Sequence, residues 1–235
     1  MSDNGTNKPN GANKPNGANK PNGANKPNGT PLVSPAPDGS IAMDADEVHP
    51  PGKVIELAAN CVRFVLAKYK VEPDFEADTL SLIDHYVTEA REDLKERPEA
   101  TALTAHAIGA YLGEVVRRSG HACWWRIDHA DPGSWRLEFR NVYLAFYPVQ
   151  VAYTALEGEE EEGTFSGFEM PDDDRDALLD RLAELPGVSE EAYFAPSTKL
   201  EVLDIAVDAL LAKRAQNPDA ARPYEPSDYE TGMPQ

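Results

Sequence analysis

Apolar residues between positions 54 and 118 recur every three or four places, which is the spacing of amphipathic helices. Pro98 interrupts the pattern, because the residue before a proline is disfavoured in a helix. Cys61 lies within the first apolar stripe and is expected in the core, whereas His85 lies off its stripe and is expected at the surface. The pattern predicts helices over residues 54–68, 75–97 and 99–118.

The third predicted helix carries two interior glycines, Gly109 and Gly113, about one turn apart. A glycine inside a helix costs about 1 kcal/mol relative to alanine, so its presence indicates that another part of the chain approaches closely. Charged residues at 114, 117 and 118 argue against a membrane-embedded helix pair. We therefore expect this helix to pack tightly, most simply against the sheet predicted next.

After Gly120 the period changes from about 3.6 residues to two. Apolar residues at 123, 125 and 127 alternate with residues 124, 126 and 128, and the alternation returns at 135–140 after a turn at 131–134. This pattern predicts an antiparallel hairpin with one apolar face and one charged face. Arg126 and Glu138 are expected to pair across the hairpin, and a third strand is expected over residues 142–147.

Residues 148–156 fit either a strand or a helix. Pro148 favours the helix, because proline is common in the first helical turn. Further helices are predicted over residues 172–185, 189–194 and 198–214. The fold class is therefore α+β, with N-terminal helices packed on a small antiparallel sheet (the hairpin plus the third strand), followed by C-terminal helices.

The segments outside this body lack an apolar pattern. Asn-Lys-Pro-Asn-Gly occurs four times within residues 7–29, and nothing in it offsets the roughly 1–2 kcal/mol that ordering each residue costs. The repeat is interpreted either as a tether that spaces four lysines or as a neutral linker. We predict three regions: a disordered repeat tail and Pro-rich linker over 1–50, one globular domain over 51–216 and a disordered acidic tail over 217–235.

The negative charge is concentrated at one end of the chain. The net charge is −19, and residues 157–235 carry −15 of it, with acidic runs at 157–162 and 172–174. Such a surface repels phosphates and anionic lipids, so we expect no direct binding to nucleic acid or membrane. The runs are interpreted as a solvated loop and a helix N-terminus, or as a docking surface for a basic protein. A DNA-mimic role is a third alternative.

The chain has no sign of export. No basic and apolar leader follows Met1, and no apolar run approaches the about 20 residues that cross a bilayer. Its two cysteines, Cys61 and Cys123, do not make a disulfide framework. We expect a cytoplasmic protein that is not associated with a membrane.

One stretch of the chain resembles a known group of domains. Residues 109–118 read Gly-Ala-Tyr-Leu-Gly-Glu-Val-Val-Arg-Arg, and Trp124 and Trp125 follow. Over about residues 75–156 the chain resembles uncharacterised bacterial α+β domains in which a Leu-Gly-Glu-Val helix leads into a Trp-bearing strand. Phe-Tyr-Pro-Val at 146–149 resembles the point where their last strand gives way to a helix. The resemblance implies a fold and carries over no activity and no site residues.

Few side chains are arranged for catalysis. His121, Cys123 and His129 make the closest cluster of metal-ligating types, but three ligands at most, one of them in a loop, fall short of a metal site. Cys123 also shares the apolar face, which argues against a Cys–His nucleophile. Glu114 is interpreted as the partner of a neighbouring arginine or as an acid of raised pKa. We expect no metal or cofactor, with an enzyme site near Glu114 and His121 as the alternative hypothesis.

Two surfaces are candidates for binding. A mixture of aromatic and cationic groups, typical of recognition surfaces, lies on the charged face of the hairpin: Trp124, Arg126, Arg136 and Arg140. The alternative is an exposed sheet face kept soluble by its arginines. The second surface is acidic: Glu159, Glu160, Glu161 and Glu162. We therefore predict a non-enzymatic protein-binding, adaptor or regulatory domain, with an immunity-type inhibitor of a basic protein as one form.

Overall fold

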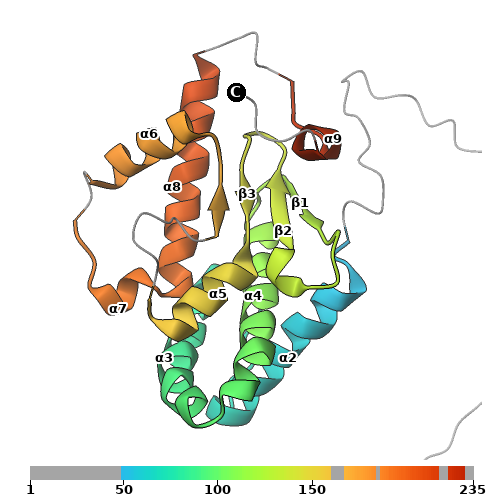
Figure 1. Ribbon diagram of the computed structural model, residues 1–235, viewed down its shortest axis with the longest axis vertical. Coiled ribbons are helices and arrows are strands. Elements are labelled where there is room, and N and C mark those ends of the chain that lie inside the picture. The colour runs from blue at the N-terminus through green and yellow to red at the C-terminus, as the bar shows by residue number, and fades with distance from the viewer. Residues whose placement is uncertain (1–48, 160–166, 184–185, 217–221, 231–235) are drawn as a thin grey trace, which may run out of the picture. The chain divides into compact units, whose positions relative to one another are not determined.

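The computed structural model describes residues 49–159, 167–183, 186–216 and 222–230, and Figure 1 shows how their elements are arranged. The helices are α2 (Gly52–Tyr69), α3 (Leu80–Glu96), α4 (Thr101–Arg118), α5 (Pro148–Glu157), α6 (Asp172–Ala183), α7 (Glu190–Tyr193), α8 (Pro196–Ala215) and α9 (Pro226–Glu230). Short 3-10 turns are η1 (Ala77–Thr79), η2 (Pro98–Ala100) and η3 (Pro132–Ser134). The strands are β1 (Cys123–Arg126), β2 (Arg136–Phe139), β3 (Ala145–Phe146) and β4 (Phe168–Glu169).

The fold is α+β, as the sequence predicts, and its four strands form one antiparallel sheet in the order β1-β2-β3-β4. The predicted hairpin is confirmed, with Cys123 opposite Phe139 and Trp125 opposite Leu137 on the apolar face. The third strand is shorter than predicted. The two-residue strand β4 was not predicted, because it is too short to show an alternating pattern.

The helix predictions agree with the structure apart from their ends. Residues 148–157 are helical, with Pro148 in the first turn, so the helical alternative for this stretch is confirmed. Helices α6, α7 and α8 lie where the pattern predicts them. Leu103 differs from its expected position on the buried face of α4, because it lies in the exposed first turn and is half exposed. None of the helices in the described ranges is both long and apolar enough to cross a membrane.

Helix α4 runs through the centre of the fold and is buried continuously from Ala107 to Val116. Both glycines are points of close approach, as predicted. A Cβ atom added at Gly109 would lie 2.5 Å from the Cα of Val149 in α5, and one at Gly113 would lie 2.3 Å from the ring of Trp125 in β1. The glycines therefore admit both α5 and the sheet.

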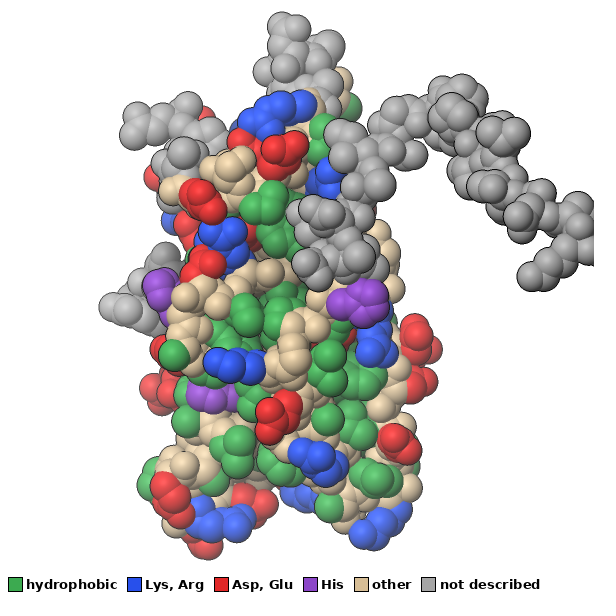
Figure 2. Space-filling model, turned by 90° about the vertical axis from the view of Figure 1, so that its right-hand side faces the viewer, with side chains coloured by type: hydrophobic (Ala, Val, Ile, Leu, Met, Phe, Trp, Pro, Cys, Tyr) green, Lys and Arg blue, Asp and Glu red, His purple; other side chains and the backbone are tan. Residues whose placement is uncertain are grey.

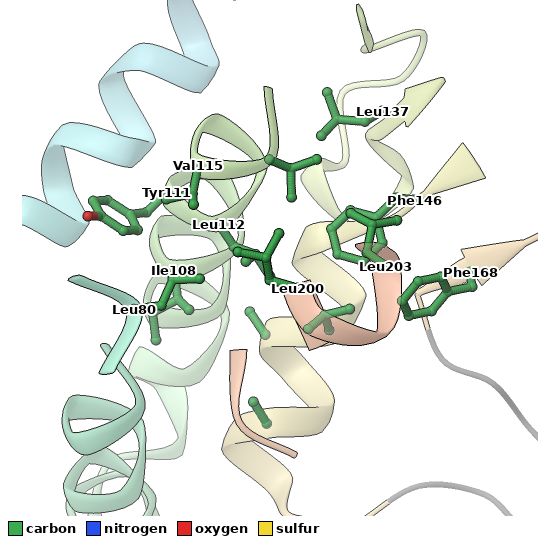
Figure 3. Close-up of a cluster of buried hydrophobic side chains, with 14 of the residues drawn as sticks. Leu80, Ile108, Tyr111, Leu112, Val115, Leu137, Phe146, Phe168, Leu200 and Leu203 are labelled. Atoms are coloured by element: carbon green, nitrogen blue, oxygen red, sulfur yellow. The ribbon is translucent and has the colours of Figure 1, made fainter. Parts of the chain in front are cut away.

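The main core lies where α4, α8 and the sheet meet. Figure 3 shows Ile108 and Leu112 of α4, Leu200 and Leu203 of α8, and Phe146 and Phe168 of the strands. Burying a side chain of this size contributes roughly 1.5–3 kcal/mol to stability, so these contacts hold α4 and α8 to the sheet. In Figure 1, α6 and α8 lie to the left of α4, and α2 lies to its right.

Residues 222–230, called here the C-terminal segment, correct the prediction of a disordered tail over 217–235. They lead into α9, whose Tyr229 is buried against the sheet. Tyr229 alone anchors this stretch, which has no hydrophobic periodicity. The prediction of disorder relied on periodicity and therefore missed the anchor. The globular domain thus extends past residue 216 to include this segment. Of the predicted tail and linker over 1–50, residues 1–48 lie outside the described residues.

Candidate functional site: the outer face of the sheet

The predicted charged face of the hairpin exists, and we call it the outer sheet face. The strand register places Trp124 opposite Glu138 and Arg126 opposite Arg136, so these four side chains share one side of the sheet. This register places Arg126 diagonal to Glu138 and not opposite it, so the two side chains interact electrostatically but do not form the predicted direct pair. Arg126 instead donates to Asp128 at 2.7 Å.

Glu138 is a fully buried carboxylate at the centre of this face. The Trp124 indole donates to one of its oxygens at 2.9 Å, and the Arg136 guanidinium donates to the other at 2.9 Å. Burial raises the pKa of Glu138, while Arg136 and the Trp124 hydrogen bond oppose the shift. Charge-assisted bonds to both oxygens are what allow a buried carboxylate to be retained, and they hold the Trp124 ring in place.

The ring of Tyr229 inserts between aromatic side chains of the outer sheet face. It stacks on Tyr143 with centroids 4.7 Å apart and an angle of 8° between the planes. It lies almost perpendicular to Trp124 at 5.9 Å and 87°. Stacked and edge-to-face pairs of this kind each contribute about 0.5–1.5 kcal/mol beyond the area that they bury.

The Tyr229 hydroxyl is buried in the connection between β2 and β3. It accepts hydrogen bonds from the backbone N–H groups of Phe139 at 3.1 Å and Leu144 at 3.2 Å. It donates to the carbonyl of Phe139 at 2.7 Å. A tyrosine hydroxyl has one hydrogen to donate and two lone pairs, so this site uses all of its capacity. Burial raises the pKa of the Tyr229 hydroxyl, which keeps it protonated as a donor.

Polar contacts hold the rest of the C-terminal segment on the same face. Arg126 donates to Glu230 at 2.8 Å, and the backbone N–H of Tyr224 donates to the carbonyl of Arg140 at 2.7 Å. The Tyr224 ring lies 4.7 Å from the guanidinium of Arg214. Arg140, a predicted binding residue, thus contributes its backbone carbonyl.

An internal ion pair shapes the segment. Arg222 donates to the Asp228 carboxylate at 2.8 Å, and the backbone N–H of Glu225 donates to the same carboxylate at 2.8 Å. These bonds lower the pKa of Asp228 to about 2. The segment is therefore folded back on itself, which presents Tyr229 and Glu230 to the sheet.

The acidic candidate surface is only partly described. Glu159 is exposed at the end of α5, whereas the predicted binding residues Glu160, Glu161 and Glu162 lie outside the described residues. The aspartates at the start of α6 are described, and Asp172 and Asp173 are exposed. The aspartates of α6 and the outer sheet face are thus separate candidate surfaces.

The side chains considered for catalysis have structural partners. Glu114 is buried, receives two hydrogen bonds from Arg117 at 2.9 and 3.0 Å and accepts another from the Trp125 indole at 2.8 Å. The interpretation of Glu114 as an arginine partner is therefore confirmed. His121 pairs with Asp204 of α8 at 2.8 Å, so the structure gives it a partner different from those of Glu114.

The cysteines are buried thiols. Burial raises the pKa of Cys123 to about 12 and raises that of Cys61 as well. A neutral, inaccessible thiol is a poor nucleophile, which agrees with the sequence prediction for both. Within the described ranges, no three or more histidine, cysteine or acidic side chains are grouped to hold a metal ion.

Two shallow pockets lie on the helical side of the domain. One, of about 380 Å³, is lined by Asp84, His85, Arg91 and residues of α7 and α8. The other, of about 510 Å³, is lined by residues of α3, α4 and α5. Neither pocket is lined by Glu114 or His121, the residues of the enzyme hypothesis.

Comparisons with protein-family models, with curated proteins and with solved structures gave no match to this chain. The assignment of function therefore rests on the geometry of the site.

Sequence reasoning selected Trp124, Arg126 and Arg136 but missed the residues that complete the site. The pattern assigns Tyr143 only to a strand and Tyr229 to a disordered tail. The signal that was available is composition, because disordered segments are poor in aromatic residues. Two tyrosines within six residues of the C-terminal segment were a reason to expect docking.

Proposed function

We propose that this chain is a non-enzymatic protein-binding domain, with an adaptor or regulatory role. Its outer sheet face holds an acidic segment of the partner that carries a tyrosine. The observation that carries the proposal is that this face already holds the chain's own C-terminal segment through Tyr229 and Glu230.

The chemistry of the face supports a short peptide as the ligand. Tyr229 is the only buried residue of α9, so one aromatic side chain anchors that helix. Arg126 adds an ion pair to the acid that follows the tyrosine. An aromatic anchor surrounded by weaker polar contacts is the usual composition of a peptide-binding hot spot. The segment would then act as a tethered competitor that a partner must displace.

The proposal is tested by supplying the segment in trans. The receptor is the full chain with Tyr229→Ala, which releases the tethered anchor, and the probe is a fluorescent peptide of residues 222–230. Fluorescence anisotropy is expected to give a Kd on the order of 100 µM, as suits one anchor and one ion pair. The wild-type chain is expected to bind the peptide at least about tenfold more weakly, because its own segment competes at a millimolar effective concentration.

Two controls make the binding test specific. The same peptide with Tyr229→Ala should not bind, and an added Arg126→Glu in the receptor should weaken binding of the unaltered peptide. Circular dichroism first establishes that each receptor is folded. A folded Tyr229→Ala chain that does not bind the peptide at about 1 mM contradicts the proposal.

A second candidate partner is a basic protein. The observation that favours it is the row of exposed aspartates along α6, namely Asp172, Asp173, Asp176 and Asp180. Such a surface speeds association with a positively charged partner and makes it sensitive to salt. We place either interaction in the cytoplasm, because Cys61 and Cys123 are both free thiols.

A further inference from the structure

Helix α2 carries a second apolar stripe beside the one that it buries. The buried stripe is Val54, Ala58, Cys61 and Val65. The second stripe repeats the same four-three-four spacing one position later along the chain: Ile55, Ala59, Val62 and Leu66. Since successive helical residues are about 100° apart, the second stripe lies about a quarter turn from the first.

The two ends of the second stripe are exposed, and Val62 near its centre also packs against the main core. Ile55 is 53% exposed and Leu66 39% exposed, and Ala59 and Val62 are partly exposed. Figure 2 views the molecule from the side on which α2 lies and shows hydrophobic side chains spread between separate charged ones. Four apolar residues in the a and d spacing of a coiled coil form a seam, which isolated surface leucines do not.

We propose that a second copy of this chain covers the stripe, with the two α2 helices antiparallel about a two-fold axis. In this arrangement Ile55 packs beside Leu66 of the second copy, and Ala59 packs beside Val62 of the second copy. The large residues at the ends of the stripe thus pack on each other across the interface, and the small Ala59 packs on Val62. A two-fold interface requires a surface that is complementary to itself in this way.

Charge at the edge of the stripe selects the antiparallel direction. Glu56 and Arg63 are both exposed and lie seven residues apart, which is one heptad, on the same edge. The apolar pairing given above places Glu56 of one copy beside Arg63 of the other, and the two-fold axis repeats the contact. In a parallel pair these charges would lie against the opposite edge of the partner helix, where Ala58 and Val65 are buried in their own domain and offer no opposite charge.

The expected association is reversible. An 18-residue helix is about 27 Å long, and one seam of this length buries less than the about 1,200 Å² of a standard interface. We therefore expect a Kd on the order of 10–100 µM. The stripe lies on α2 and the peptide site on the outer sheet face, so this inference does not depend on the proposed function.

Sedimentation velocity of the full chain tests the dimer. The weight-average mass is expected to rise from monomer towards dimer between about 1 µM and about 1 mM. Ile55→Glu with Leu66→Glu should raise the Kd about tenfold or more, because both put charge into the seam. Neither side chain is part of the buried core, so the variant is expected to fold. Leu179→Glu, at a comparably exposed leucine of α6, should leave the Kd unchanged.

A charge exchange tests the direction. Glu56→Arg alone, or Arg63→Glu alone, should raise the Kd about threefold or more, since each creates two like-charge contacts. The double variant should return the Kd to within about twofold of the wild type. A chain that stays monomeric at about 1 mM overturns the proposal, as does a dimer that persists when the stripe is charged. A double variant that does not recover overturns the antiparallel pairing.

Discussion

The Tyr229 hydroxyl supplies a hydrogen-bond partner that the connection between β2 and β3 needs. The backbone N–H of Leu144 donates to this hydroxyl at 3.2 Å, in a position closed to solvent. A phenylalanine would keep the stacking on Tyr143 but leave this donor without its acceptor, at a cost of about 1–3 kcal/mol. We therefore expect the outer sheet face to hold tyrosine more tightly than phenylalanine.

The Arg222–Asp228 ion pair makes docking of the C-terminal segment sensitive to acid. Hydrogen bonds from Arg222 and from the backbone of Glu225 lower the pKa of Asp228 from 3.8 to about 2. A group whose pKa is depressed on folding stabilises the folded form above its unfolded pKa. The stabilisation is therefore present above about pH 4 and is lost as the pH falls through about 2.

We expect the near-ultraviolet circular dichroism of the Tyr143–Tyr229 cluster to weaken between about pH 4 and pH 2. Asp228→Asn should remove this transition, because it has no carboxylate to protonate. Glu138 acts in the opposite direction: burial raises its pKa, so its protonation favours the folded hairpin as the pH falls. A transition of equal size in Asp228→Asn would show that protonation of Asp228 is not its cause.

At the scale of elements, α4 connects the parts of the domain. Two elements pack closely against its centre: α5 contacts it at Gly109, and Trp125 of β1 contacts it at Gly113. The Trp125 indole in turn donates to Glu114 of the same helix. The helix, the sheet and α5 therefore share one junction, and the outer sheet face depends on it.

Gly109→Ala tests this junction. Alanine is the better helix former by about 1 kcal/mol, yet its Cβ would meet backbone atoms of Val149, which are not free to move aside. Overpacking of this kind costs about 1–3 kcal/mol, so we expect a lower free energy of unfolding in urea. Gly52→Ala in the first turn of α2 is the matched control, because its Cβ would meet no atom within 4 Å. Equal effects at the two positions would contradict the account.

At the scale of the whole molecule, the parts of the fold that depend on local periodicity were predictable. The stripe around Cys61, the alternation around Trp125 and the glycines of α4 each carry their signal within about 20 residues. The outer sheet face was recognised for the same reason, because alternation assigns Trp124 and Arg126 to one side of a strand.

What covers that face was not predictable from local pattern. Tyr229 bonds to residues 85 and 90 positions earlier in the chain, and no periodicity connects them. Arg126 lies diagonal to Glu138 and not opposite it, because the register follows the apolar pair of Trp125 with Leu137. Contacts between residues far apart in the chain therefore cannot be predicted from local pattern.

The proposed function requires that the outer sheet face hold the C-terminal segment as a displaceable ligand. Amide hydrogen exchange followed by NMR tests it directly, by comparing Leu144, which donates to Tyr229, with Leu112 at the centre of α4. We expect Leu144 to exchange about 100-fold faster or more, through local release of the segment, and to lose its protection in Tyr229→Ala. Equal exchange rates in the wild-type chain would show that the segment leaves only when the whole domain unfolds, and would contradict the account.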